Sequence, residues 1–190
     1  MKRLLLILIL TLNFQSWTKA DDIRDFEIEG MSIGDNLLDH ISKNNIEKLT
    51  ENYYKDNRYT AITVFPEDNT RLKFKTYDAV VLNFLTNDTN YELQAISGII
   101  IYEESIIDCI KKSDQIVKEF KTFFVNTEVK NNNFKGVFGN VKSVEFNFKN
   151  EDKVIVSCYD YLPHETHTDH LRVSIDRKEF LEWVEEKAYK

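Results

Sequence analysis

The stretch that decides the fold is Ser143-Val144-Glu145-Phe146-Asn147-Phe148-Lys149-Asn150-Glu151-Asp152-Lys153-Val154-Ile155-Val156-Ser157-Cys158. Apolar and polar residues alternate on both sides of a polar centre, as they do in two β-strands that each bury one face. A three-residue loop at 150–152 places the apolar residues of the two strands opposite each other, beginning with Phe148 opposite Val154. A two-residue loop would place Phe148 opposite Lys153. Burial therefore predicts a β-hairpin with the three-residue loop.

Two amphipathic segments lie on either side of this hairpin in the sequence. Apolar residues recur at helical spacing over 105–124 and over 177–188, and the second segment follows Asp176, a residue typical of helix caps. Other stretches have the composition of strands: 60–65, 71–75, 77–85, 91–101 and 170–175. These patterns predict a single α+β domain at 21–190, a mostly antiparallel sheet of meanders and hairpins packed by the two helices.

Three further segments complete the predicted organisation. Residues 25–29 alternate like a short strand and lead through a Gly-containing turn into an apolar-periodic helix over 37–49, with a break at Asn44-Asn45. The Asn-rich segment 126–140 predicts a long, mobile polar loop. The segments 79–124 and 142–188 share a weak β-β-α pattern, which an old duplication would explain.

The first twenty residues predict a cleaved export signal. They combine Lys2 and Arg3, an apolar run at Leu4–Leu12 and Thr18-Lys19-Ala20 before Asp21. A positive start, a short apolar region and small residues before the cut are the secretory pattern, and a run of nine residues is too short to span a bilayer. We expect the mature chain to begin at Asp21, in the periplasm of a bacterium or outside the cell.

Composition then excludes several classes of partner. The signal removes three positive charges and no acid, so the net charge changes from −7 to −10. Nucleic acid and anionic membrane surfaces both require clustered positive charge. No apolar stretch after Leu12 approaches the length of a membrane span. The first cysteine is Cys109, far from the cleavage region, so the sequence predicts no lipid anchor.

The two cysteines, Cys109 and Cys158, both lie on apolar faces, one on the predicted helix at 105–124 and one on the strand that this helix should cover. In an oxidising compartment facing cysteines normally pair, and closing a loop of about 50 residues stabilises a fold by roughly 4 kcal/mol in the chain-entropy model. Two separate buried thiols are the alternative. We favour the disulfide because export supplies the oxidant.

One stretch near the N-terminus matches a hydrolase motif. Gly30-Met31-Ser32-Ile33-Gly34 has the form G-x-S-x-G of a nucleophile elbow, yet that elbow belongs to the centre of a parallel sheet. Ser32 as a cap or turn residue explains the same letters. The overlapping Gly34-Asp35-Asn36-Leu37 resembles the nucleophile block of GDSL hydrolases, but Asn36 stands where the serine would be. A serine hydrolase at Ser32 is the function that we favour least.

Three of the four histidines fall within seven residues. His164, His167 and His170, with Asp169 beside them, have the chemistry of a Zn²⁺ or Cu²⁺ site. In an extended segment His164 and His170 share one side while His167 points away, so a loop would have to gather them. The alternative is a solvated loop between strands, with His170 pointing outward from the strand at 170–175.

Three tyrosines lie close together in the sequence. Tyr53, Tyr54 and Tyr59 are suited to a contact surface for a sugar or a peptide, because the phenol ring combines flat apolar area with a polar tip. The alternative is that they close the seam between a helix and the sheet. The sequence leaves both interpretations open.

Five stretches, 26–35, 97–100, 108–109, 157–161 and 169–174, give the chain a resemblance to a group of small exported proteins of marine alphaproteobacteria. The first reads Phe-Glu-Ile-Glu-Gly-Met-Ser-Ile-Gly-Asp. The resemblance covers nearly the whole chain and implies a bacterial origin and export. It implies no activity and no site residue, because the group has no established activity.

The function that these observations favour is a non-enzymatic binding or envelope-associated module. Its contacts would come from the sheet face, the Asn-rich segment and the tyrosines, with an unidentified protein, peptide or small ligand as partner. The alternative is a periplasmic metal-binding protein that uses His164, His167 and His170 to bind zinc or copper.

The export signal makes a direct prediction. When the full-length chain is expressed in a bacterium with a periplasm, its intact mass in the periplasmic fraction should correspond to a chain beginning at Asp21. A mass that retains residues 1–20, or a protein confined to the cytoplasm, would contradict the prediction.

Overall fold

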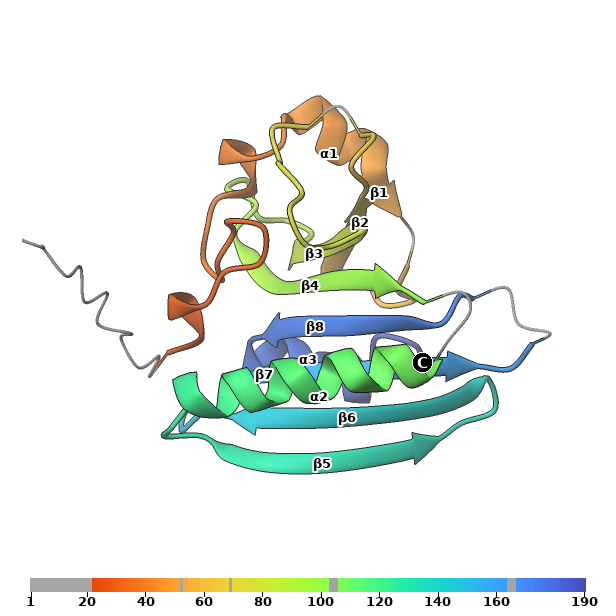
Figure 1. Cartoon of the computed structure of the whole chain (residues 1–190). Coiled ribbons are helices and arrows are strands. Elements are labelled where there is room, and N and C mark those ends of the chain that lie inside the picture. The colour runs from red at the N-terminus through yellow and green to blue at the C-terminus, as the bar shows by residue number, and fades with distance from the viewer. Residues whose placement is uncertain (1–21, 52, 69, 103–105, 164–166) are drawn as a thin grey trace, which may run out of the picture.

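The computed structural model describes residues 22–51, 53–68, 70–102, 106–163 and 167–190. Its centre is one antiparallel sheet of eight strands in the order β1-β2-β3-β4-β8-β7-β6-β5 (Figure 1). The strands are β1 (Thr50–Glu51), β2 (Tyr59–Val64), β3 (Ala79–Leu85), β4 (Leu93–Ile101), β5 (Glu128–Lys135), β6 (Gly139–Asn147), β7 (Lys153–Tyr161) and β8 (His170–Asp176). The predicted α+β domain, mostly antiparallel sheet, is confirmed.

Helices cover both faces of the sheet. In Figure 1, α2 lies in front of β7 and β8 while α3 lies behind the sheet. The helices are η1 (Ile23–Asp25), η2 (Leu37–Asp39), α1 (Lys43–Leu49), α2 (Ile106–Phe123) and α3 (Lys178–Glu186), of which the η elements are short 3-10 turns. The two long helices agree with the predicted segments 105–124 and 177–188. In the described part of the chain no helix has the length and apolarity needed to cross a membrane.

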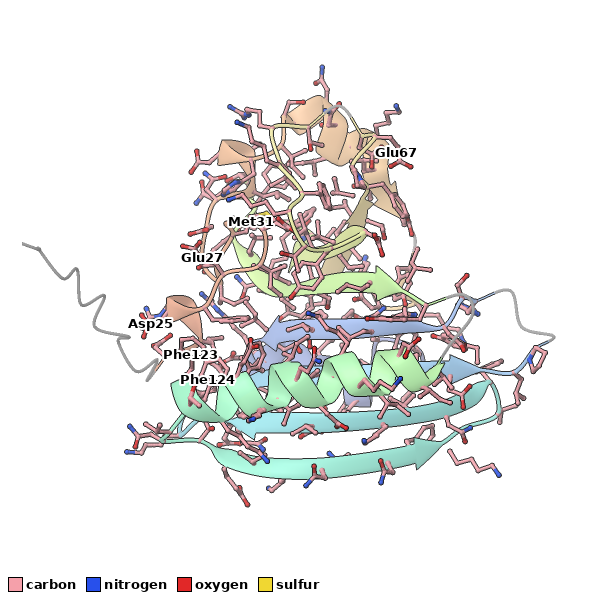
Figure 2. All side chains as sticks on the ribbon, in the orientation of Figure 1. Asp25, Glu27, Met31, Glu67, Phe123 and Phe124 are labelled. Carbon is pink, nitrogen blue, oxygen red and sulfur yellow. A yellow bond between two sulfur atoms is a disulfide. The ribbon has the colours of Figure 1, made fainter. Side chains whose placement is uncertain are left out.

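The face covered by α2, which we call the first face, carries the main hydrophobic core. Phe120 and Phe124, in and just after the last turn of α2, pack edge-on against Phe26 with ring centroids 5.0 and 5.7 Å apart. Figure 2 shows Phe124 beside the N-terminal segment that carries Asp25 and Glu27. The N-terminal segment and α2 therefore share this core, and α2 packs mainly on β7 and β8.

A disulfide bond fixes α2 to the sheet. The sulfur atoms of Cys109 in α2 and Cys158 in β7 are 2.07 Å apart, and both side chains are buried. The pair closes a segment that includes all of β5 and β6. The covalent link thus ties the helix to the strand that it packs against, where the two apolar faces were predicted to meet.

The central hairpin has the predicted loop length at a different position. The Phe148 N–H donates to the Asp152 carbonyl, which leaves Lys149–Glu151 as the loop. Glu151 adopts a φ of 69°, the left-handed conformation that closes a three-residue hairpin. The predicted register was wrong, because Val154 lies opposite Phe146 and not opposite Phe148. The partner differs by two residues, which is one full period of a strand, so every side chain stays on its predicted face.

The prediction of a mobile loop over 126–140 was wrong. Residues Glu128–Lys135 form the edge strand β5, and β6 begins at Gly139. Each residue of β5 pairs with β6, including the three consecutive asparagines. The physical reason is tertiary: the exposed edge of β6 supplies a ladder of backbone hydrogen bonds that local composition does not reveal.

Two predicted strands are absent. Asp25 ends the 3-10 turn at Ile23–Asp25, and Ile28 then begins a tight turn in which it exchanges backbone hydrogen bonds with Met31. Residues 71–75 are irregular. The carboxylate of Glu29 accepts hydrogen bonds from three consecutive backbone N–H groups at 75–77, at 2.8 to 3.0 Å. The backbone N–H groups of 75–77 are therefore bonded by one side chain and not by a neighbouring strand.

The helix boundaries differ from prediction in two places. The segment 37–49 is interrupted at 40–42 rather than at 44–45, because Ser42 caps α1. Helix α3 has Arg177 as its N-cap and no side-chain capping bond. Asp176 does not cap it, because its carboxylate accepts a hydrogen bond from the Ser174 hydroxyl on the sheet.

Gly139, at the start of β6, permits the close approach of β7. A Cβ atom there would lie 2.1 Å from the Asp160 carbonyl oxygen, and the glycine φ is +152°. We expect Gly139→Ala to cost about 3 kcal/mol in the free energy of unfolding. Gly30→Ala is the matched control, because it also has a positive φ but no atom within 4 Å, and should cost about 1 kcal/mol. If urea denaturation gives equal losses of unfolding free energy for the two variants, the close approach of β7 is not what requires Gly139.

Candidate functional site

The sheet face opposite α2, which we call the second face, is polar and aromatic. In β8 the side chains of Leu171, Val173 and Ile175 lie in the main hydrophobic core of the first face. Since side chains alternate along a strand, His170 and Arg172 project from the second face. Buried polar side chains collect there: Asn83, Ser97, Ser157, His170, Ser174 and Asp176. Burying polar groups costs free energy unless they are bonded, so a face of this kind is a candidate site.

One part of the second face is closed by α3 and by tyrosines. The Tyr54 hydroxyl donates to Asn83 Oδ1 at 2.7 Å, and the Tyr54 and Trp183 ring centroids are 4.7 Å apart. Tyr59 is buried against Trp183 at 4.8 Å. Tyr54 and Tyr59 thus close the helix–sheet seam, while Tyr53 remains 51% exposed. The seam interpretation is confirmed for Tyr54 and Tyr59, and a contact surface for a sugar or a peptide at Tyr53 stays a prediction.

Beyond α3 the second face carries a row of rings that we call the aromatic stack: Tyr159, Tyr161, His167 and His170. Tyr159 lies over His170 with centroids 4.6 Å apart and planes 18° apart. Tyr161 lies over His167 at 5.0 Å and 21°. The guanidinium carbon of Arg172 is 5.3 Å from the centre of the Tyr159 ring. Strands β7 and β8, with His167 just before β8, therefore hold a flat aromatic surface with a cation at its edge.

Two nitrogens in this region are enclosed without a partner. His170 Nδ1 lies 2.9 Å from the Thr168 carbonyl oxygen, but Nε2 is buried and makes no hydrogen bond. Burial lowers the pKa of His170 to about 4, so its ring is neutral at pH 7. The Nε atom of Arg172 is likewise buried and unbonded.

The tip of the β5–β6 hairpin adds exposed apolar side chains to the same end of the face. Val137 is 83% exposed, Phe134 67% and Phe138 61%. Leu162 is held to the tip by a hydrogen bond from its N–H to the Phe138 carbonyl. An apolar cavity of about 380 Å³ lies between the hairpin tip and the stack, lined by Phe134, Val137, Phe138, Val141, Tyr159 and Tyr161. Its size is that of a small-ligand site.

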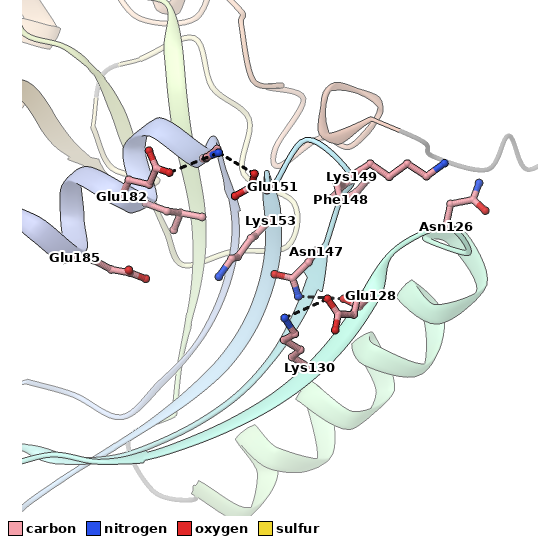
Figure 3. A pocket seen from close by; sticks show the side chains of 12 residues that line it. Asn126, Glu128, Lys130, Asn147, Phe148, Lys149, Glu151, Lys153, Glu182 and Glu185 are labelled. Atoms are coloured by element: carbon pink, nitrogen blue, oxygen red, sulfur yellow. Dashed lines mark hydrogen bonds and ion pairs between the residues drawn. The ribbon is translucent and has the colours of Figure 1, made fainter.

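A second groove, of about 510 Å³, runs between β5–β7 and α3 (Figure 3). Its charges neutralise one another. Lys178 binds Glu151 at 2.8 Å, and Lys130 binds Glu128 at 3.1 Å. Lys153, which also lines the groove, binds Glu145 at 3.0 Å. Because acids and bases alternate and pair, the groove presents no excess charge to a ligand.

The predicted metal ligands are partly outside the described residues. His164 is one of these. His167 and His170 both contact Tyr161, contrary to the expectation that His167 points away, and His170 is buried rather than directed to solvent. Asp169 Oδ1 accepts the Tyr161 N–H at 2.7 Å. Within the described ranges no three His, Cys, Asp or Glu side chains form a group able to hold a metal ion.

Ser32 and Asn36 have structural partners. The Ser32 hydroxyl donates to the Phe26 carbonyl at 3.1 Å, and the Asp35 carboxylate accepts the Ser32 N–H at 2.8 Å. Asn36 caps the 3-10 turn at Leu37–Asp39 by accepting the Leu38 N–H. The residues of the hydrolase motif thus form a turn and a helix cap in the N-terminal segment, which contributes to the core of the first face.

Signals for the aromatic stack were present in the sequence but were not interpreted. Tyr159 and Tyr161 alternate on β7, and His170 and Arg172 alternate on β8, which is the pattern of one sheet face. The composition of 126–140 predicts a polar loop and so misses the apolar tip residues Val137 and Phe138. Their role depends on pairing between strands that are distant in sequence.

Asp176 predicts a pH dependence of stability. Its carboxyl is buried, and burial raises the pKa from 3.8 to about 6, although Ser174, Arg172 and Lys153 act in the opposite direction. Because the pKa is higher in the folded protein, the protonated carboxyl stabilises the fold below about pH 4. This stabilisation is lost as the pH rises through 6.

We expect Asp176→Asn to remove this loss. The variant should gain up to about 3 kcal/mol in unfolding free energy relative to the unmodified chain between pH 4 and pH 8, measured by urea denaturation. Asp25→Asn, at an exposed position, controls for the removal of one negative charge. Parallel pH curves for Asp176→Asn and the unmodified chain would refute the prediction.

The chain was also compared with known proteins. No protein-family model, no curated protein and no solved structure matches it.

Proposed function

We propose that the chain is an exported, non-enzymatic binding protein and that its binding surface is the second face at the end formed by the hairpin tip and the aromatic stack. We propose export because residues 1–20 have the pattern of a secretory signal. The Cys109–Cys158 disulfide supports an oxidising compartment, the periplasm or the cell exterior.

The observation that carries the proposal is the gathering of exposed apolar groups at one place. Phe134, Val137, Phe138 and Leu162 form the tip, and Ile101 continues the row across the sheet through register partners in β6, β7 and β8. Tyr53 and Tyr189 are also exposed, and they interact electrostatically with Tyr161 and Tyr159, respectively. Contiguous exposed apolar patches on soluble proteins mark interaction sites, because leaving them in water costs free energy.

The chemistry of the surface suits contact. Burial raises the pKa of Tyr161, and burial also raises the pKa of Tyr189, so both phenols stay protonated and can donate hydrogen bonds at neutral pH. Tyrosine rings supply large rigid contact area at a small cost in conformational entropy. The surface thus offers apolar area together with hydrogen-bond donors.

An apolar dye tests the proposal. Bis-ANS should bind the mature protein and fluoresce, and the double variant Val137→Ser, Phe138→Ser should lose most of that fluorescence, because it removes the tip without removing core side chains. Ile107→Ser is the matched control, since Ile107 is 62% exposed but lies on α2. Far-ultraviolet circular dichroism should be unchanged in both variants.

The reverse pattern would overturn the proposal. If the dye does not bind, or if Ile107→Ser lowers the fluorescence as much as the tip variant does, the tip and stack are not the binding surface.

A further inference from the structure

The polarity of the second face changes in order along its strands, starting from the hairpin tip. The outermost residues are Val137 and Phe138, in the turn between β5 and β6. Strand pairing then places two rows across the sheet. The row nearer the tip is apolar and aromatic: Phe134, Val141, Tyr159 and His170. The row two residues farther from the tip is polar: Asn132, Ser143, Ser157 and Arg172. The surface therefore passes from apolar through aromatic to polar at one end of the sheet.

The depth of the apolar part matches the outer layer of a lipid bilayer. Strands rise about 3.3 Å per residue, so the chain from Val137 back to Phe134 spans about 10 Å. Amphipathic elements that lie in a membrane surface bury their apolar side about 5–10 Å into the boundary between head groups and acyl chains. Tyrosine is enriched at this boundary, because it combines an apolar ring with a polar hydroxyl. Tyr159 is level with Phe134 in the sheet and so lies at the depth of that boundary.

The tip also has the exposure that insertion requires. The Val137 side chain is 83% exposed and therefore has few protein neighbours. Figure 1 shows the connection between β5 and β6 at the end of the sheet, where β7 also ends. Leu162, which directly follows β7, is joined to this connection by its hydrogen bond to Phe138. These apolar side chains can thus enter a fluid apolar phase together, without a change in the fold.

The charge of the tip selects a neutral surface. From Phe134 to Val141 the only charged residue is Lys135. Lys135 is exposed and alternates with Phe134 along β5, so its ammonium can stay at the level of the lipid phosphates while the Phe134 ring is buried. The chain without residues 1–20 carries a net charge of −10, which anionic lipids would repel. The surface that matches the tip is therefore a bilayer of zwitterionic lipids.

We propose that the hairpin tip inserts into one leaflet of a zwitterionic lipid bilayer, with Phe134, Val137 and Phe138 among the acyl chains. The aromatic row then lies at the head groups, and the polar row stays in water. This inference rests on the proposed function, because it names the partner of that surface. A bilayer accounts for the order of the layers, which a small apolar molecule in the cavity beside the tip would not require.

Quenching of tryptophan fluorescence by brominated lipid tests the inference. The mature protein is used, because the apolar run Leu4–Leu12 would itself partition into lipid. Its only tryptophan is the buried Trp183. Phe138→Trp adds a reporter at the tip, and phosphatidylcholine vesicles with bromine on the acyl chains should remove most of the added emission. Val125→Trp is the matched control, because Val125 is exposed but follows Phe124 at the other end of the sheet (Figure 2), and its emission should not change.

Sedimentation with vesicles measures the same binding without a reporter. The unmodified mature protein should sediment with phosphatidylcholine vesicles. The double variant Val137→Ser, Phe138→Ser should bind at least about tenfold more weakly, because its tip no longer transfers two apolar side chains out of water. Val125→Ser should bind as the unmodified protein does. Addition of phosphatidylglycerol to the vesicles should weaken binding at low salt, because the protein and this lipid are both negatively charged.

Four results would overturn the inference while leaving the proposed function intact. If bis-ANS binds at the tip but vesicles neither sediment the protein nor quench Phe138→Trp, the partner is not a bilayer. If Val125→Trp is quenched as strongly as Phe138→Trp, lipid binds elsewhere. If phosphatidylglycerol strengthens binding at low salt, charge and not the tip drives it. If analytical ultracentrifugation finds a dimer that the double variant separates, the occupant is a second copy. Failure of bis-ANS itself refutes the proposed function.

Discussion

The rest of the structure depends on the antiparallel pairing of β4 with β8. Seven residue pairs, from Ala95 with Asp176 to Ile101 with His170, join two four-stranded halves into one sheet. Gly98 lies at the middle of this seam, where the Tyr77 ring leaves no room for a Cβ atom. Because β8 is the last strand of the chain, the sheet is complete only when its C-terminal strand is placed. The pairing also sets which residues of β8 face which core.

That arrangement produces two faces of different chemistry. The first face is covered by the N-terminal segment and α2, and the disulfide holds α2 in place, so it is an ordinary apolar core. The second face is covered by α3 over part of its width. The uncovered end leaves Tyr159 and Tyr161, with the neutral His170 ring beside them, next to an apolar hairpin tip. Incomplete coverage by α3 thus leaves exposed the part of the second face that we propose as the binding surface.

Much of the fold followed from periodicity, since strand alternation and helical spacing are local. The long helices, the hairpin faces and the Cys109–Cys158 pairing were accessible in this way. The edge strand β5 was not, because consecutive asparagines are typical of loops and only the neighbouring strand gives their backbone groups partners. The site was predicted in fragments: tyrosines, histidines and a sheet face were named separately, with the hairpin tip treated as mobile. Their meeting depends on strand order, which the sequence pattern leaves open.

The sequence by itself determined the α+β class, the side of the sheet to which each residue of a strand points, and the apolar placement of both cysteines, because the two-residue period of a strand and the 3.6-residue period of a helix act within a few residues. Only the tertiary structure decided that β8 joins the two halves, that Glu29 and not a strand binds the segment 75–77, and that His170 is buried. Those outcomes depend on contacts between residues far apart in the chain, whose energies no local pattern contains.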